Sequence, residues 1–396
     1  MNTLQLPKVI IHNSKTDAIL RFHPWIFSGA VKSKDDSIKN DTLVEVVNER
    51  GKFLAIGYFT QSNIAVRILS FSPIESLQNL FQEKICNAFE SRKTIGLTGN
   101  ANTNTYRLIH AEGDGIPGLI IDFYDGVCVV QAHSVFIAKQ MALIAECLQK
   151  VYGEQLVAVY NKSNNTLPKH NEYGKDEFVF GKAETLTVKE NENLFRVDFV
   201  TGQKTGFFID QRENRKLLAT YSKGKKVLNT FCYTGGFSVY AAKANAQKVV
   251  SVDSSEKAMI LTEQNIAINN CETIHESVTS DVFDYLKTVK KGDFDVIVLD
   301  PPAFAKNVAA RHHAIQAYKR INLEAMQKLE QGGILFTFSC SQVVNYDLFR
   351  GAVTAAAIEA GKNIRILHQL TQPPDHPINI FHPEGNYLKG LVLLVN

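Results

Sequence analysis

An aspartate that directly follows an apolar run is well placed to do chemistry in this chain. Asp300 comes after the run Val-Ile-Val-Leu at 296–299 and is followed by Pro301 and Pro302. Proline has no N–H to donate and cannot continue a central strand, so the two prolines hold Asp300 at a rigid turn. Open α/β sheets bind ligands at the carboxyl ends of their strands. A carboxylate beside a proline face and the ring of Phe304 suits a flat, hydrogen-bonding heterocycle. The plainer interpretation is an ordinary strand-to-helix turn.

A cysteine ends a second apolar segment, one α/β unit further along the chain. A Gly-Gly turn leads into the segment that ends at residue 339, and Cys340 follows it, flanked by two serines. In a sheet with short connections the tips of such strands are neighbours, so we expect Cys340 to lie near Asp300. A buried structural cysteine is the commoner fate of this residue. Its position at a strand tip, outside the apolar run, favours a functional role.

A glycine turn upstream has the pattern of a nucleoside site. An apolar strand at 226–230 runs into Gly235 and Gly236, a small-residue helix follows, and a second strand ends at Asp253. The glycines let the backbone approach a ligand, and the helix presents unpaired N–H groups. Asp253 has the position of the acid that binds ribose hydroxyls in nucleotide-binding βαβ units. Because the full G-x-G-x-x-G spacing is missing, we favour a nucleoside over a ligand that carries a pyrophosphate.

Composition limits the class of protein. At 396 residues we expect two or three domains, since about 150 residues per domain is usual. The apolar runs fall well short of the ~18 residues of a membrane span, and the N-terminus lacks a signal-peptide pattern. Six scattered cysteines without a C-x-x-C pair indicate neither a zinc site nor a disulfide framework, so we expect a cytosolic protein without a metal. A net charge of +3 permits nucleic-acid binding through local basic patches but does not argue for it.

The chain divides into three segments by pattern. Residues 1–72 read as a small β module, in which strands 43–47 and 53–59 flank a hairpin signal. Residues 73–189 read as a small α+β domain that ends in a polar stretch from 161 to 176, extending to about 189. From 190 to 396, strands and helices alternate, which predicts an α/β fold with a doubly wound parallel sheet.

The elements expected in the two larger segments follow from apolar periodicity and turn residues. In the middle segment we expect helices at 76–92 and 136–151 and strands at 119–123, 127–132 and 156–160. In the last segment we expect strands at 226–230, 248–252, 273–278, 294–299, 333–339, 363–369 and 387–395, and Asp281 as a helix cap.

These motifs, in this order, resemble a class I S-adenosylmethionine-dependent methyltransferase. Four further segments extend the resemblance to nearly the whole chain: HPWIFSGA at 23–30, EGDGIPGL at 112–119, KTGFFIDQREN at 204–214, and HP at 376–377 with PEGNYLKG at 383–390. Together with the Asp-Pro-Pro and Ser-Cys-Ser segments they resemble the RlmI-type family of bacterial 23S rRNA cytosine-C5 methyltransferases.

The resemblance implies an architecture and a set of roles. It implies an N-terminal PUA domain that binds RNA, a central α+β domain and a Rossmann-like catalytic domain. It also implies S-adenosylmethionine as cofactor, 23S ribosomal RNA as partner and Cys340 as the nucleophile. The residues expected at the cofactor are Phe208, Asp210, Arg212, Asn229, Phe231, Tyr233, Gly235, Gly236, Asp253, Ser254, Asp281, Val282 and Asp300, and those expected at the target base are Pro301, Pro302 and Phe304. For Arg212 a helix-capping role is the competing interpretation.

Two features depart from related patterns. Many class I enzymes carry an acid where this chain has Asn229. Asparagine offers no negative charge to the cofactor's ammonium group, and Asp300 is expected to supply part of that charge. The other large family of RNA cytosine-C5 methyltransferases has a second cysteine beside the proline of this motif. The corresponding place in this chain is Pro301-Pro302, so Cys340 alone can be the nucleophile here. Candidate phosphate contacts in the first segment are Arg21, Lys32 and Lys34, with a solvated basic face as the competing interpretation.

The expected reaction uses both strand-tip residues. A thiolate of Cys340 adds to cytosine C6 and makes C5 nucleophilic, while Asp300 bonds N3 and the exocyclic amine. An electropositive cleft would favour this thiolate. The alternatives are methylation of an exocyclic amine or a purine N7 with an inert Cys340, and a catalytically silent RNA-binding assembly factor. A nicotinamide dehydrogenase is disfavoured by the missing third glycine. A homodimer is compatible with the sequence.

Overall fold

The computed structural model describes residues 4–169 and 171–396, so residues 1–3 of the first expected segment and His170 of the polar stretch lie outside the described residues. The chain forms two compact units, each built from more than one stretch. Unit 1 comprises Met1–Leu186, Asp198–Phe207 and Pro374–Gly385, and unit 2 comprises Thr187–Val197, Phe208–Pro373 and Asn386–Asn396. No helix in these described ranges is long and apolar enough to cross a membrane.

A six-stranded sheet forms the N-terminal part of unit 1, in the order β2-β6-β5-β4-β1-β3. Its strands are β1 (Lys8–Ile11), β2 (Trp25–Phe27), β3 (Val31–Lys34), β4 (Leu43–Asn48), β5 (Phe53–Phe59) and β6 (Ile64–Ser70), with the short helices η1 (Asn13–Lys15), α1 (Asp17–Leu20) and η2 (Ser28–Ala30) between them. The expected β4–β5 hairpin is confirmed. The Asn48 side chain fixes its turn, because Oδ1 accepts the N–H groups of Arg50 and Lys52.

A five-stranded sheet forms the rest of unit 1, in the order β11-β10-β9-β8-β7. Its strands are β7 (Thr105–His110), β8 (Leu119–Tyr124), β9 (Val127–Ala132), β10 (Ala158–Asn161) and β11 (Glu177–Gly181), and its helices are α2 (Leu77–Thr94), η3 (Ala111–Asp114), α3 (Val135–Ala138), α4 (Met141–Tyr152) and η4 (Gly153–Gln155). The single helix expected at 136–151 is wrong in detail, because Lys139 and Gln140 interrupt it and Ser134 caps the first piece. Strands β7 and β11 were not expected, because short, partly polar segments resemble loops.

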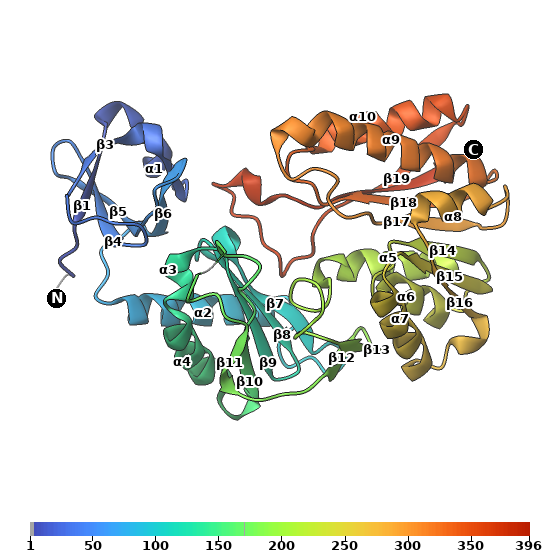
Figure 1. Cartoon of the computed structure of the whole chain (residues 1–396), viewed down its shortest axis with the longest axis horizontal. Coiled ribbons are helices and arrows are strands. Elements are labelled where there is room, and N and C mark those ends of the chain that lie inside the picture. Colours follow the sequence, from blue (N-terminus) through green and yellow to red (C-terminus); the bar gives the residue numbers. More distant parts are fainter. Residues whose placement is uncertain (1–3, 170) are drawn as a thin grey trace. The chain divides into compact units, whose positions relative to one another are not determined.

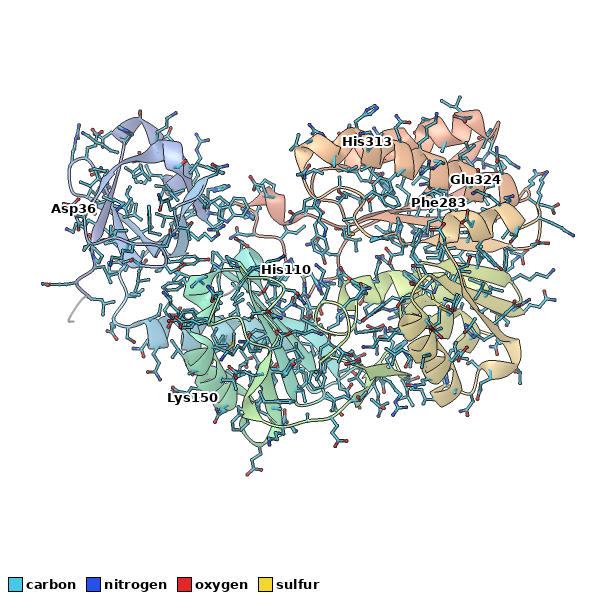
Figure 2. The ribbon with its side chains drawn as sticks, viewed as in Figure 1. Asp36, His110, Lys150, Phe283, His313 and Glu324 are labelled. Carbon is cyan, nitrogen blue, oxygen red and sulfur yellow. The ribbon has the colours of Figure 1, made fainter. Side chains whose placement is uncertain are left out.

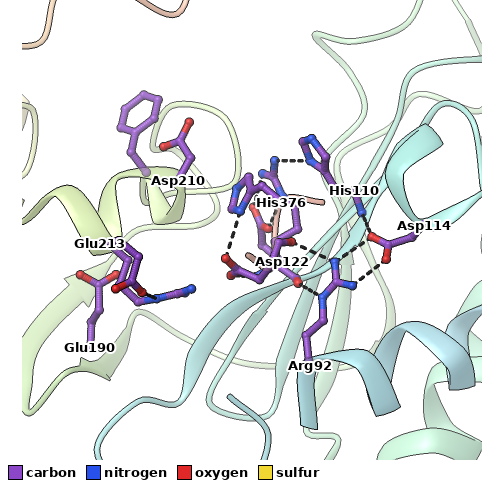
Figure 3. Close-up of polar contacts among 12 residues, drawn as sticks. Arg92, His110, Asp114, Asp122, Glu190, Asp210, Glu213 and His376 are labelled. Atoms are coloured by element: carbon purple, nitrogen blue, oxygen red, sulfur yellow. Dashed lines mark hydrogen bonds and ion pairs between the residues drawn. The ribbon is translucent and has the colours of Figure 1, made fainter. Parts of the chain in front are cut away.

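A buried arginine holds several segments of unit 1 together (Figure 3). Arg92 on α2 is 1% exposed and donates both terminal nitrogens to the carboxylate of Asp114, at 2.6 and 2.7 Å. The guanidinium also donates to the carbonyls of Arg107 and Asp375, at 2.8 and 2.9 Å. Asp114 in turn accepts the N–H of His110. These bonds tie α2 and β7 to the stretch that returns to unit 1 near residue 375.

The glycine-rich segment at 112–119 serves this packing. A Cβ on Gly113 would stand 2.0 Å from the carbonyl oxygen of Pro377, so only glycine allows the returning stretch to pass. Glu112 accepts the indole N–H of Trp25 at 2.8 Å. Two of the segments that carry the family resemblance, around Trp25 and around Gly113, therefore contact each other directly.

Unit 2 is a seven-stranded sheet in the order β16-β15-β14-β17-β18-β20-β19, preceded by a small hairpin (Figure 1). The hairpin strands are β12 (Leu186–Glu190) and β13 (Asn193–Val197), and the sheet strands are β14 (Lys226–Thr230), β15 (Lys248–Asp253), β16 (His275–Thr279), β17 (Val296–Leu299), β18 (Ile334–Ser339), β19 (Ile364–Leu370) and β20 (Lys389–Val395). All seven expected sheet strands are confirmed to within about two residues.

Helices cover both faces of this sheet, as expected of a doubly wound fold. Figure 1 shows α8, α9 and α10 on one face and α5, α6 and α7 on the other. The helices are η5 (Ile209–Gln211), α5 (Arg212–Ser222), α6 (Gly236–Lys243), α7 (Glu256–Ile268), η6 (Glu272–Ile274), α8 (Val282–Thr288), η7 (Val308–Ala310), α9 (Arg311–Lys328), α10 (Tyr346–Glu359) and, in the stretch belonging to unit 1, η8 (Pro383–Gly385). Phe283 on α8, labelled in Figure 2, packs against α9, where the Arg320 guanidinium lies 4.8 Å from its ring centroid.

The expectation of a wholly parallel sheet needs one correction. Strand β20 runs antiparallel to both β18 and β19. Between β19 and β20 the sequence holds only the three-residue 3-10 helix η8, whereas the crossover that joins parallel strands is usually a longer α-helix. The chain instead returns in the opposite direction and fills the place between β18 and β19.

The Arg92 pair predicts a large stability effect. Arg92→Ala leaves the Asp114 carboxylate buried without its cation, so we expect a loss of about 3–5 kcal/mol and a clearly lower Tm by calorimetry. The neighbouring Lys93 is exposed and 3.6 Å from Glu90, so Lys93→Ala should change the stability by less than about 1 kcal/mol. Equal Tm values for the two variants would contradict this role of Arg92.

Candidate active site at the strand tips

Four neighbouring parallel strands of unit 2 end at the same edge of the sheet. Strand β14 pairs with β15 and β17, and β17 pairs with β18, with Leu299 opposite Thr337. Asp300 follows β17 by one residue and Cys340 follows β18 by one residue. The expected neighbourhood of Asp300 and Cys340 is therefore confirmed, and their side chains interact electrostatically.

The turn after β14 is conformationally unusual. Phe231, Tyr233 and Gly235 all have positive φ, of 53°, 48° and 76°. A Cβ on Gly235 would stand 2.7 Å from Cγ2 of Thr262 on α7. Glycine is thus required by the left-handed backbone and by contact with α7. The glycine pattern in the sequence indicates only the close approach of a ligand.

Asp253 at the end of β15 is bonded to this turn. Its Oδ2 accepts the N–H of Tyr233 at 3.0 Å, and its Oδ1 accepts the N–H of Ser255 at 2.9 Å. The carboxylate is partly exposed, and each oxygen retains a further lone pair. Asp253 can therefore accept hydrogen bonds from a diol without giving up its place in the fold.

The segment before α5 brings a second carboxylate to the same unit. The Tyr387 hydroxyl donates to Oδ2 of Asp210 at 2.7 Å, and Phe208 packs edge-on to Tyr233 with ring centroids 5.0 Å apart. Among the described residues, Oδ1 of Asp210 and Oδ1 of Asn229 are buried and have no hydrogen-bond partner. Buried acceptors of this kind usually have a partner, so a ligand that donates hydrogen bonds fits here.

Asp300 is a carboxyl group with an altered acidity. Burial, and next the nearby Asp210, raise the pKa of Asp300 to about 7, while a hydrogen bond from Gln211 and the charge of Arg215 oppose the rise. Near neutral pH the group is therefore divided between acid and carboxylate. As the acid it can donate one hydrogen bond and accept another, which a carboxylate cannot do.

The Cys340 thiol is partly buried, and its acidity departs from our expectation. Burial, followed by the charges of Asp300 and Asp210, raises the pKa of Cys340 to about 11, and only Lys389 acts in the opposite direction among its charged neighbours. A thiolate at Cys340 is expected only if the cleft is electropositive. Burial first, and then the two carboxyl groups, favour the protonated thiol instead.

The residues expected at the target base lie in the loop after β17. Pro301 is buried and Pro302 is exposed. Phe304 is partly buried, and its ring centroid lies 4.8 Å from that of Tyr318 on α9. Phe304 therefore already packs on an aromatic neighbour, and at most part of its ring can stack on a base.

Other expected residues have mainly structural contacts. Ser254 and Asp281 are exposed, and Asp281 caps α8 as expected by accepting the N–H of Asp284. Val282 packs in the core beneath α8. The Arg212 guanidinium is buried and bonds Glu213 at 3.1 Å, and the helix-capping interpretation is not supported, because no side-chain hydrogen bond from the described residues caps the start of α5.

Three polar residues that the sequence analysis did not single out support the site. Gln211 donates to Asp300, and Arg215 donates to both carboxylate oxygens of Glu190, at 2.8 and 2.7 Å. Helical spacing alone places Arg215 near residue 211, but nothing in the sequence indicates that a hairpin glutamate is its partner.

Comparisons with known proteins agree with this geometry. Residues 107–391 match the family model described as S-adenosylmethionine-dependent methyltransferase, and residues 9–71 match a PUA-like domain. The chain is 41% identical over 401 residues to ribosomal RNA large subunit methyltransferase I of Aeromonas hydrophila, covering 97% of this chain and 98% of that protein. It is 37% identical to the protein of the same name from Escherichia coli, covering 98% and 99%.

Solved structures give the same fold. A protein from Streptococcus mutans assigned as a SAM-dependent methyltransferase superposes with a TM-score of 0.83 at 22% identity, covering 98% of this chain and 100% of the other. A protein assigned as a methyltransferase and solved in complex with SAH has a TM-score of 0.83 at 23% identity, with the same coverage. At these identities the likeness shows the fold.

The raised pKa of Asp300 predicts a pH-dependent stability. Ionised Asp300 is penalised in the folded chain, so the stability of the wild type falls as the pH rises from the unfolded pKa of 3.8 to about 7 and is constant above. Asp300→Asn lacks this penalty and should be more stable than the wild type at pH 8 by about 1–3 kcal/mol, with a smaller gain at pH 5.

Thermal unfolding at the two pH values measures this difference. Asp347, which is 80% exposed on α10, supplies the control Asp347→Asn for simple loss of a surface carboxylate. A Tm gain of Asp300→Asn that is larger at pH 5 than at pH 8 would contradict the assignment.

Proposed function

This chain belongs to the S-adenosylmethionine-dependent methyltransferase family, and from that premise we propose that it forms 5-methylcytosine in large-subunit (23S) ribosomal RNA. The observation that carries the cytosine-C5 assignment is the pairing of Asp300 and Cys340 at adjacent strand tips. Asp300 can hold a pyrimidine by its hydrogen-bonding edge while the Cys340 sulfur reaches a ring carbon. The names of the relatives support ribosomal RNA as the substrate.

The residues of unit 2 fit the cofactor. S-adenosylmethionine is the cofactor of the family, and when bound it supplies an electrophilic methyl group on a sulfonium sulfur. Asp253 would accept the ribose hydroxyls. The buried acceptors of Asp210 and Asn229 would receive the ammonium group, which supplies the hydrogen-bond donors that they lack. The carboxylates around the strand tips also suit the positive charge of the sulfonium.

The remaining residues expected at the cofactor lie either on the turns or at the ends of β15 and β16. Residues on the turns would line the cofactor through backbone or ring atoms. They are Phe208, Phe231, Tyr233, Gly235 and Gly236. Residues at the ends of β15 and β16 would meet the adenosine through exposed polar groups or backbone N–H groups. They are Ser254, Asp281 and Val282.

Asp300 would hold the target cytosine. The neutral acid can donate its O–H to cytosine N3 while its carbonyl oxygen accepts from the exocyclic amine. Its pKa near 7 makes this form available at neutral pH. The base must leave any helical stack to reach the strand tips, and the exposed Pro302 and part of Phe304 offer apolar surface to it.

Cys340 would act as the nucleophile. Loss of the S–H proton leaves a thiolate, whose electron pair forms a bond to C6 of the cytosine. Electron density then accumulates at C5, where negative charge is stabilised through N3 by Asp300, and C5 can accept a methyl group. A base then takes the C5 proton, and the C5–H electron pair forms the C5–C6 double bond. The S–C6 bond breaks with its electron pair on sulfur, which regenerates the aromatic ring and the thiolate.

A second candidate function is methylation of an exocyclic amine or a purine N7. The raised pKa of Cys340 favours it, because a thiol that stays protonated is a weak nucleophile. The Asp-Pro-Pro-Ala-Phe segment suits an amine substrate as well. In that reaction Cys340 would be dispensable.

The N-terminal module would bind RNA. Its match to a PUA-like domain supports this role. Of the three candidate phosphate contacts, Lys32 lies 3.3 Å from Glu49 and Lys34 donates to the carbonyl of Ile38, so Arg21 is the candidate without such a contact among the described residues. A ribosomal RNA substrate supports a cytoplasmic location. The division at residues 72 and 189 and a homodimer remain predictions.

Cofactor affinity tests the ribose assignment. Asp253→Ala should weaken binding of S-adenosylmethionine to the full chain by about tenfold or more, because two charge-assisted hydrogen bonds are lost. Isothermal calorimetry measures this, with Asp284→Ala on the exposed face of α8 as the control. Unchanged affinity in Asp253→Ala would remove the residue from the cofactor site.

Covalent trapping tests the nucleophile. Cys340→Ser should retain cofactor and RNA binding but lose methylation by about a thousandfold or more, since a neutral hydroxyl is a poor nucleophile. Cys86, the other partly exposed cysteine among the described residues, gives the control Cys86→Ser, which should remain active. RNA with 5-fluorocytosine at the target should form a stable adduct with the wild type. Near-normal activity of Cys340→Ser without an adduct would favour the amine or N7 reaction.

A further inference from the structure

A buried lysine stands next to Cys340 without a counter-charge. Lys389 begins β20 and is paired with Ser339, the residue before the cysteine. It is 5% exposed, and its Nζ donates to the carbonyl oxygen of Ser341 at 2.7 Å. In the described part of the chain, no carboxylate oxygen lies within 4.0 Å of this ammonium. Lysines are rarely buried without such a partner, because desolvation of the charge is costly.

Cys340 is the titratable group whose charge acts on this lysine. The residues on both sides of Cys340 contact Lys389, one through the strand pairing and one through the Nζ hydrogen bond. A Cβ on Gly390 would stand 2.6 Å from the Phe338 ring, so β20 lies close against β18 at this point. The charged and titratable groups that face the thiol from other elements are Asp300 after β17, Asp210 in η5, which bonds Tyr387, and Tyr318 on α9.

We propose that Lys389 is the proton partner of Cys340: its amine takes up the thiol proton, and the resulting ammonium stabilises the thiolate. This inference rests on Cys340 as the nucleophile of the proposed function. In the step, the S–H bond breaks, its electron pair stays on sulfur, and an N–H bond forms on Nζ. The proton returns by the reverse path when the thiolate leaves the base. Lys389 is a positioning residue, since it acts through Cys340.

The acidities of the two groups suit this exchange. Burial lowers the pKa of Lys389 to about 8, while the interaction with Cys340 opposes the fall. The amine is therefore largely neutral in mildly alkaline solution. The pKa of the Cys340 thiol is about 11, which is about three pKa units above that of Lys389. Above pH 8, therefore, about one molecule in a thousand carries the ammonium–thiolate pair and the others carry the neutral amine and thiol.

This coupling predicts a bend in the pH dependence of thiol reactivity. Below pH 8 the population of thiolate beside the ammonium rises tenfold per pH unit. Above pH 8 the lysine loses its own proton, and the population levels off until the thiol itself titrates. The bend reflects deprotonation of Lys389, so the alkylation rate of a thiol without such a partner shows no bend near pH 8.

The experiment is alkylation of Cys340 by iodoacetamide in the cofactor-free, full-length protein, followed on the Cys340 peptide by mass spectrometry from pH 6 to pH 10. Lys389→Gln retains a donor for the Ser341 carbonyl but no charge, so its rate at pH 7 should fall about tenfold and show no bend near pH 8. Lys389→Arg retains a permanent charge, so its rate at pH 7 should remain within about threefold of the wild type, also without the bend. Lys248→Gln, a change at the start of β15 where the lysine pairs with Glu276, is the control.

Two outcomes would overturn the proposal. A wild-type profile in Lys389→Gln would show that the lysine does not control the thiol. If Lys389→Arg alkylates at pH 7 as slowly as Lys389→Gln, the reactivity of Cys340 depends on the shape of the lysine and not on its charge. Because alkylation needs neither RNA nor cofactor, its result is independent of the trapping experiment. If no adduct forms with the 5-fluorocytosine RNA but the alkylation rate still bends near pH 8, the C5 reaction is disproved and the Lys389–Cys340 pair remains supported.

Discussion

The buried ion pair between Glu190 and Arg215 is the interaction on which the rest of unit 2 depends. Both side chains are nearly inaccessible, and the two hydrogen bonds between them compensate for the removal of both charges from water. Arg215 also donates to the carbonyl of Phe208, and Glu190 accepts from the hydroxyl of Tyr240 on α6. A Cβ on Gly236 would stand 3.1 Å from the Arg215 side chain. One pair thus joins the β12 hairpin, the segment before α5 and the glycine turn after β14.

Fixing that segment creates an electrostatic conflict at the strand tips. Asp210 is brought near Asp300. Burial, and next the charge of Asp210, raise the pKa of Asp300, while burial, followed by Asp300 and Asp210, raises the pKa of Cys340. The same negative charge suits a cationic sulfonium cofactor and opposes a thiolate. A site that needs both must add a positive charge close to the sulfur only. In our proposal Lys389 supplies that charge, and burial lowers the pKa of its amine to about 8, so that it can release its proton.

The sequence predicted the frame of the catalytic unit better than its polar interior. Apolar runs bounded by glycine and proline located every strand of the large sheet, and parallel strands with short connections required Asp300 and Cys340 to be neighbours. The direction of β20 could not be read from its apolar run, which looks the same in either orientation. The partnership of Glu190 with Arg215 joins residues from different elements. In the sequence, Lys389 looks like an ordinary polar residue near the start of a strand. Burial of a charged residue depends on the tertiary fold and leaves no periodic signal in the sequence.

Asn229 occupies the position at which many class I enzymes carry an acid for the cofactor's ammonium group. Its Nδ2 donates to Ser238, whose hydroxyl bonds that of Ser251, which in turn contacts His275 at 2.7 Å. Burial lowers the pKa of His275 to about 4, so this chain of groups is neutral at physiological pH. A carboxylate at residue 229 would be buried among neutral groups, with no cation in this chain of contacts to offset its desolvation. Asp210 lies instead on the segment fixed by the Glu190–Arg215 pair, and its buried Oδ1 has no hydrogen-bond partner among the described residues. The acid that many class I enzymes carry on the first strand is thus replaced, in our proposal, by an uncharged acceptor on the strand and a carboxylate on the segment before α5.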